Sequence, residues 1–73
     1  MDGKIKVKTY GRTELAQMYF PGYTAKAAWR RLRSWLALCP PLRAELARLG
    51  YDGRRRTFTP AETAAIFEYI GEP

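Results

Sequence analysis

Polar and apolar residues alternate near the start of the chain. In residues 4–10, Ile5 and Val7 alternate with lysines, and β-branched residues with a period of two are typical of a half-buried strand. A second short segment, 54–58, is basic and ends in an aromatic residue, which predicts a short exposed strand. Because two isolated strands in one small domain have few other partners, we expect 4–10 and 54–58 to pair with each other.

The remaining pattern is helical. Apolar residues at i, i+3 and i+4 spacing, bounded by prolines and glycines, predict helices over residues 12–20, 25–38, 42–49 and 60–70. Thr24 is placed to cap the second helix, and Thr59 with Glu62 forms a capping-box pattern at the start of the last. The sequence therefore predicts a single domain over residues 1–73, mainly α with a small two-stranded antiparallel sheet (α+β).

The predicted helix over residues 25–38 has two distinct faces. Its apolar positions, which include Trp29 and Trp35, fall on one third of the helical wheel, so we expect both tryptophans in the core. Lys26, Arg30 and Arg33 gather on the opposite side, and Arg31 flanks them. The segment contains no acidic residue, so this basic stripe is not neutralised within its own helix.

Composition excludes several kinds of chemistry. The chain has 73 residues, a formal net charge of +6, no histidine and one cysteine. A disulfide framework needs two cysteines, a structural zinc site needs four Cys or His ligands, and a catalytic triad needs a histidine base. We therefore expect no enzyme activity, no metal and no cofactor. The lone Cys39 and the polar N-terminus predict a cytoplasmic protein. The chain has no long apolar run, which predicts that it has no membrane segment.

The positive charge is concentrated rather than spread. Residues 24–38 carry a net charge of +4, whereas residues 58–73 carry −3. A basic helix face beside a basic strand is the electrostatic pattern of a nucleic-acid-binding protein, so we predict that the chain binds double-stranded DNA. The predicted contact residues are Thr24, Lys26, Arg30, Arg31 and Arg33 of the helix, Arg54, Arg55 and Arg56 of the second strand, and Lys6 and Lys8 of the first.

Two alternatives stay open at this point. Four charges on an exposed helix face are also what a merely solvated surface shows, since surplus charge keeps small proteins soluble. The ten aromatic residues of so short a chain also fit a protein–protein interaction module, such as a homodimer, with no nucleic-acid role.

Two stretches carry a resemblance to a known family. They are Lys8-Thr9-Tyr10-Gly11-Arg12-Thr13-Glu14-Leu15-Ala16 with Tyr19-Phe20-Pro21, and Arg55-Arg56-Thr57-Phe58-Thr59-Pro60-Ala61 with Tyr69-Ile70-Gly71-Glu72-Pro73. With Ala28-Trp29-Arg30 and Trp35 between them, the chain resembles a family of short uncharacterised gut-bacterial proteins classed as a domain of unknown function. That resemblance covers nearly the whole chain and implies no particular activity.

At a broader level the order of elements resembles the winged helix-turn-helix domains of the excisionase and MerR type. Thr13, Glu14, Leu15 and Ala16 resemble the first helix of those domains, and Arg55, Arg56, Phe58 and Thr59 resemble the exit from their basic wing. The chain departs from that pattern by an extra segment, residues 40–50, between the recognition helix and the wing. The resemblance implies a winged helix-turn-helix-like fold and a regulatory or architectural role on DNA.

Overall fold

Four helices and two very short strands make up the part of the protein that the structure describes. The computed structural model describes residues 6–73. The helices are α1 (Arg12–Tyr19), α2 (Ala25–Ala37), α3 (Pro40–Arg48) and α4 (Pro60–Ile70), and the strands are β1 (Tyr10–Gly11) and β2 (Thr57–Phe58). The prediction of a mainly α domain with a small two-stranded antiparallel sheet is confirmed.

The helices begin and end where local chemistry requires it. The Thr24 Oγ1 accepts a hydrogen bond from the Ala27 N–H at 3.2 Å and caps α2. At α4, Thr59 and Glu62 form the predicted capping box, in which each side chain accepts the other's backbone N–H. Gly50 follows α3 with φ of +99°, a conformation that L side chains rarely adopt, so a glycine suits this stop.

The sheet is shorter than the sequence predicts. Tyr10 pairs with Phe58 and Gly11 with Thr57, in antiparallel register, so the predicted partners do meet. However, residues 6–9 and 54–56 are not strand, and Lys4 and Ile5 of the predicted first strand lie outside the described residues. The ladder stops because α1 begins immediately after Gly11 and the α4 cap immediately after Phe58. Val7, one of the two apolar residues of the predicted half-buried strand, is exposed.

A single core joins all six elements. Phe58 lies fully buried within it, against the rings of Trp29 and Tyr51 at centroid distances of 6.1 and 4.9 Å. The large aliphatic side chains that are fully buried in the same core are Leu15 of α1, Leu32 of α2, Leu42 of α3 and Ile66 of α4. So short a strand is therefore held in place largely by the burial of its one aromatic side chain.

The two tryptophans of α2 have different environments. Trp29 is buried, as predicted, but Trp35 is 42% exposed, so the prediction of a core position for Trp35 is wrong. On a helix these two residues lie about 120° apart, and the buried side chains Leu32 and Leu36 leave Trp35 at the edge of the core. Part of the Trp35 side chain therefore remains open to solvent.

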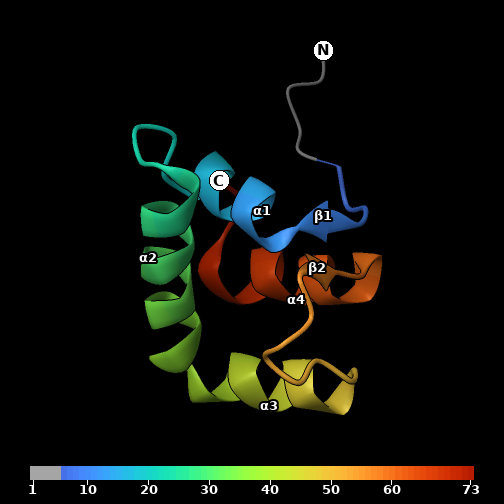
Figure 1. Cartoon of the computed structure of the whole chain (residues 1–73). Coiled ribbons are helices and arrows are strands. Elements are labelled where there is room, and N and C mark those ends of the chain that lie inside the picture. The colour runs from blue at the N-terminus through green and yellow to red at the C-terminus, as the bar shows by residue number, and fades with distance from the viewer. Residues whose placement is uncertain (1–5) are drawn as a thin grey trace.

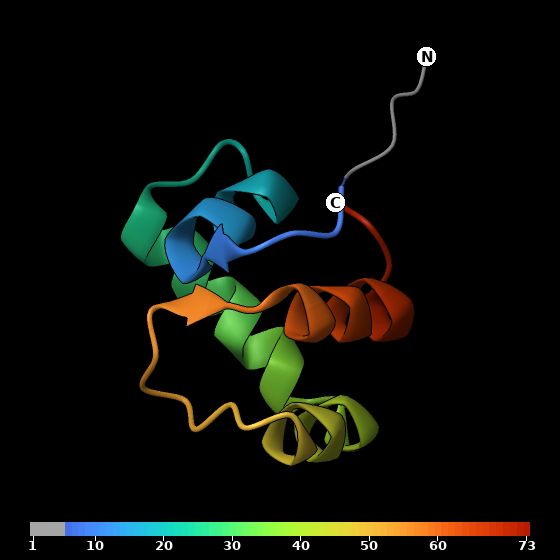
Figure 2. The same ribbon diagram turned by 90° about the vertical axis from the view of Figure 1, so that its right-hand side faces the viewer.

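The helices enclose the core from different directions (Figure 1). In this view α2 runs vertically along the left side. α1 and α4 lie beside α2 and across its direction, with α1 above α4, and α3 lies at the bottom of the molecule. Figure 2 shows that the segment joining α3 to β2 runs along the side of the molecule away from the C-terminus. One long flank of α2 is therefore not covered by any element of residues 6–73.

Candidate nucleic-acid interface

The exposed flank of α2 carries a row of three cations. Lys26, Arg30 and Arg33 occupy positions i, i+4 and i+7, and all three are exposed. They share one side of the helix because such spacings return to the same face. We call these three residues the α2 strip. Its positive charge is undiluted, because the chain has no Asp or Glu between Glu14 and Glu45.

The α2 strip has no ion pair within residues 6–73, where the salt bridges are Arg48–Glu45 on α3 and Arg55–Glu62. Its charges are therefore available to a ligand. Thr24, predicted as a contact residue beside the strip, is exposed at the start of α2, but its hydroxyl oxygen is the N-cap acceptor. Its structural role explains its presence there without a ligand.

The strip continues onto α3 at its far end. A cavity of about 350 Å³ is lined by Arg33 and Ala37 of α2, by Arg43 of α3 and by Asp52 and Gly53 of the following loop, together with Leu36, Leu46 and Tyr51. Arg43 is exposed and has no ion pair among the described residues. Arg43 was not among the predicted contact residues, although its position three residues after Pro40, away from Leu42 and Leu46, marks it as an outward-facing helical residue.

The loop that carries the three consecutive arginines is fixed by its backbone. Asp52 Oδ1 accepts the backbone N–H groups of Arg54 at 2.8 Å and of Arg55 at 3.3 Å. These hydrogen bonds, that of Arg54 first, hold the pKa of Asp52 below its usual value. On the other side of the loop, the Arg56 carbonyl accepts the Arg12 N–H at 2.8 Å. Residues 54–56 form a tied loop rather than the predicted strand, and Arg54 and Arg56 are exposed on it.

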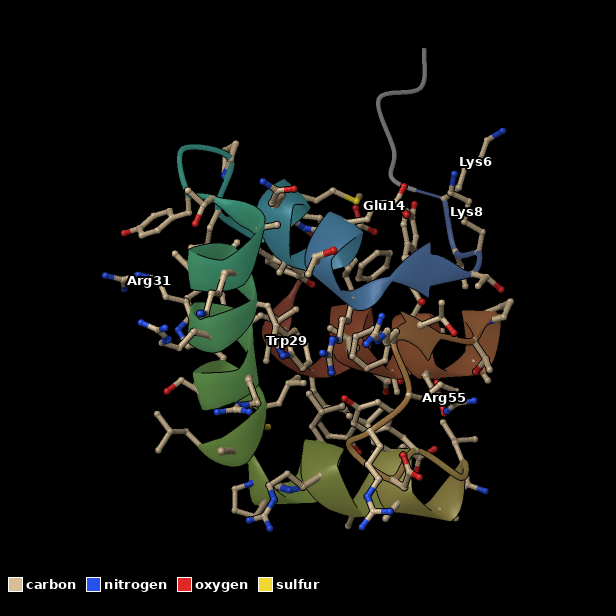
Figure 3. The ribbon with its side chains drawn as sticks, in the orientation of Figure 1. Lys6, Lys8, Glu14, Trp29, Arg31 and Arg55 are labelled. Atoms are coloured by element: carbon tan, nitrogen blue, oxygen red, sulfur yellow. The ribbon has the colours of Figure 1, made fainter. Side chains whose placement is uncertain are left out.

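Arg55 is already engaged inside the protein. Its guanidinium donates a hydrogen bond to Glu62 Oε2, and the Glu62 side chain is fully buried whereas that of Arg55 is 37% exposed. The guanidinium also lies 5.9 Å from the centroid of the Tyr51 ring. Figure 3 shows Arg55 beside α4. Unlike its two neighbours, Arg55 therefore neutralises a buried carboxylate and anchors the loop to α4.

Arg31 lies apart from the α2 strip. Its guanidinium stands 4.8 Å from the centroid of the Tyr23 ring, a cation–π arrangement. Figure 3 shows Arg31 directed outward from α2, whereas Trp29 points into the core. Of the four basic residues predicted on this helix, three form one row and Arg31 faces a different part of the surface.

The N-terminal lysines lie far from α2. Lys6 and Lys8 are exposed beside β1, on the side of the molecule opposite Arg31 and α2 (Figure 3). Lys8 Nζ is 5.1 Å from the centroid of the Tyr10 ring, and the Tyr10 hydroxyl donates to the Lys6 carbonyl at 2.8 Å. The ten predicted contact residues therefore do not lie on one surface. The continuous basic surface consists of the α2 strip, Arg43 and the start of the 52–56 loop.

Other chemistry on the described surface is sparse. Within residues 6–73 no three His, Cys, Asp or Glu side chains come together in a group able to hold a metal ion. In the same range no helix has the length and apolar character needed to cross a membrane. Cys39 is a half-buried free thiol at the start of α3.

One comparison with known proteins gives a match. A family model, described as Domain of unknown function (DUF4248), matches residues 6–73. The searches of curated proteins and of solved structures gave no match. The matched range contains every helix and strand of the fold, as well as the α2 strip. The chain therefore belongs to the DUF4248 family of domains of unknown function.

Proposed function

We propose that this protein binds double-stranded DNA through the α2 strip, in the manner of a helix-turn-helix domain with a regulatory or architectural role. The observation that carries the proposal is the row of three exposed, unpaired cations on a helix flank that no other described element covers. A row of this kind neutralises phosphates and releases their counterions. The DNA major groove is about 12 Å wide and admits one α-helix.

The arrangement of the first two helices supports this mode of binding. A turn of five residues, 20–24, joins α1 to α2, and the two helices cross steeply (Figure 1). In helix-turn-helix proteins the first helix crosses the DNA backbone while the second enters the major groove. In that placement Arg30 is the residue suited to a bidentate contact with guanine, whereas Arg31 is held over Tyr23.

The basic surface beyond the end of α2 adds backbone contacts. Arg43 shares a cavity with Arg33, and Arg54 follows Gly53 at its border. These side chains extend the positive surface from one helix to two further segments. Arg55 holds the loop through Glu62, so in this proposal it positions Arg54 and Arg56 and makes no contact of its own with DNA.

The test is the salt dependence of binding to a fluorescent random-sequence 20-base-pair duplex, followed by anisotropy. On random-sequence DNA, where Arg30 has no specific guanine to contact and pairs with a phosphate, there are four phosphate contacts, one for each residue of the strip and one for Arg43. They give a slope of log K against log salt of about −3.6. Binding should then weaken by about 150-fold between 50 and 200 mM salt. The variant Lys26→Gln/Arg30→Gln should reduce the magnitude of the slope by about 1.8.

A charge-matched variant separates local contacts from net charge. Ala44 and Ala61 are exposed on α3 and α4, so Ala44→Glu/Ala61→Glu lowers the net charge by the same two units without touching α2. This control should keep a slope within a few tenths of the wild-type value. Absence of binding at 50 mM salt, or equal losses in the two variants, would refute the proposal.

A further inference from the structure

A groove runs along the other exposed side of α2. Its volume is about 570 Å³, and Tyr23 from the α1–α2 turn contributes to its wall. The remaining lining residues all belong to α2 or its C-cap: Ala27, Arg30, Arg31, Ser34, Trp35 and Leu38. Arg30 is the one residue that the groove shares with the α2 strip, and the other groove residues play no part in the DNA-binding proposal.

Large apolar side chains are exposed at this groove. Leu38 is 80% exposed, Trp35 42% and Tyr23 40%. They are three of the five large hydrophobic residues that are exposed within residues 6–73, and they line one cavity. Such a gathering of apolar side chains on the surface of a small domain marks an interaction site, because covering it removes apolar surface from water.

The aromatic wall of the groove is fixed in place. The Trp35 ring meets the rings of Phe20 and Tyr19 at centroid distances of 4.8 and 6.1 Å, both in edge-to-face geometry. Phe20 in turn contacts the Tyr23 ring at 5.7 Å. Side chains held in this way lose little further freedom when a ligand arrives, which favours binding.

The charge of the groove indicates the charge of its occupant. Arg30 and Arg31 are among its lining residues, and no Asp or Glu is. Two copies of the chain docked through this groove would bring arginines together without compensating carboxylates, which disfavours a symmetric dimer here. An occupant with carboxylates beside its apolar side chains would be complementary in both charge and polarity.

The shape of the groove favours a helix as the occupant. Ala27 and Leu38 are eleven residues apart, so the groove follows α2 for about 16 Å, or three turns. The small side chains Ala27 and Ser34 lie two turns apart between larger neighbours, and small residues allow a second helix to approach closely. A helix laid in a groove uses apolar residues at i, i+3, i+4 and i+7 in this way.

Single-stranded nucleic acid is the competing occupant, because arginines and aromatic rings also bind bases. Base stacking needs a free aromatic face. Here the Arg31 guanidinium lies over the Tyr23 ring, and Trp35 already has two aromatic neighbours. The most exposed apolar side chain, Leu38, is aliphatic. These features favour a protein partner.

We infer that this groove binds an acidic amphipathic helix of a partner protein, whose apolar side chains contact Trp35 and Leu38 and whose carboxylates pair with Arg30 and Arg31. Apart from Arg30, which borders both, the residues of the groove are distinct from those of the α2 strip, so the two proposed ligands contact adjoining flanks of the same helix.

The probe is a fluorescein-labelled 16-residue helical peptide with leucines at i, i+3, i+4, i+7 and i+11 and glutamates flanking them. Its control carries lysines in place of the glutamates. The full-length protein should bind the acidic peptide at micromolar to tens of micromolar concentration, and the lysine peptide at least tenfold more weakly. Leu38→Ser should weaken binding of the acidic peptide about tenfold, because a leucine side chain contributes about 1.5 kcal/mol or more on burial.

The fold is not at risk in this test, because Leu38 is mostly exposed. Lys26→Gln/Arg33→Gln, on the α2 strip, should leave peptide binding within twofold of the wild-type value while reducing DNA binding, so the two proposals fail separately. Equal binding of the two peptides, no binding of either at 200 µM, or full binding by Leu38→Ser would overturn the inference. Displacement of the acidic peptide by a 15-residue oligothymidine that Leu38→Ser no longer binds would also overturn it, and would assign the groove to single-stranded nucleic acid.

Discussion

Replacing Glu62 by glutamine tests what holds the 52–56 loop to the core. The Glu62 carboxylate is fully buried. One oxygen accepts the Thr59 N–H at 2.9 Å and the other accepts a hydrogen bond from the Arg55 guanidinium. Glutamine keeps the volume of the side chain and an oxygen for the α4 cap, but it removes the negative charge and sets an amide group against a cation.

The expected cost follows from the exposure of the two partners. Removing one member of a fully buried ion pair costs about 3–5 kcal/mol, because the other charge is left without compensation. Here Arg55 is 37% exposed, so its guanidinium regains part of its hydration when the pair is broken. We therefore expect Glu62→Gln to lower the free energy of unfolding by about 1.5 kcal/mol. For a domain of this size that corresponds to a fall in Tm of about 6–12 °C.

Thermal unfolding followed by circular dichroism measures this fall, and urea unfolding at 25 °C gives the free energy directly. The matched control is Glu45→Gln. Glu45 pairs with Arg48 on α3, and these side chains are 30% and 67% exposed, so the pair is screened by solvent and this change should lower Tm far less than Glu62→Gln does. If Glu62→Gln lowers Tm no more than Glu45→Gln does, the loop is not held by the charge of Glu62 and the reasoning fails.

Three further predictions concern stability. The Thr63 hydroxyl is fully buried and has no hydrogen-bond partner among the described residues, so Thr63→Val should raise the free energy of unfolding by about 1 kcal/mol in urea titrations; a loss would contradict this. Gly50→Ala should cost about 1 kcal/mol because φ is +99° there, whereas Gly22→Ala, in an open turn without positive φ, should be neutral in the same assay. Burial first, and then the charge of Glu72, raises the pKa of Tyr19, whose hydroxyl donates to the Gly71 carbonyl. Because the neutral phenol is favoured in the folded state, this stabilisation is complete below about pH 10 and is lost as the pH rises toward the raised pKa. Tyr19→Phe should therefore show a smaller loss of stability between pH 8 and pH 11 than the wild type, and an equal loss would refute the assignment.

The helices could be predicted because their signals are local. Each helix start depends on residues within its first turn, namely Thr24 for α2, Pro40 for α3 and Thr59 with Glu62 for α4. The end of α3 is marked by Gly50, which has a positive φ. Such signals require only nearest neighbours along the chain. The predicted boundaries differ from the observed ones by two residues at most, at the start of α3.

The extent of the sheet and the exposure of Trp35 were harder to predict from the sequence. Period-two alternation predicted a strand of seven residues, but strand pairing depends on where the partner segment turns away, and both partners turn into helices after two residues. The helical wheel placed Trp35 on the apolar face because it carries no information on where the neighbouring helices sit. The way the neighbouring helices pack decides that α2 buries Ala28, Trp29, Leu32 and Leu36 and that Trp35 lies at the edge of the core.

Local sequence patterns are enough to predict a mainly helical domain with an uncompensated row of cations on α2, because helical periodicity, caps and charge spacing are properties of residues close together in the chain. Tertiary structure alone decided how the basic residues are divided. It pairs Arg55 with the buried Glu62, sets Arg31 over Tyr23 and carries Lys6 and Lys8 to the opposite side of the molecule. The physical reason is that an ion pair or a stacking contact depends on which segments meet in space, and identical arginines in one run differ only in the neighbours that the fold gives them.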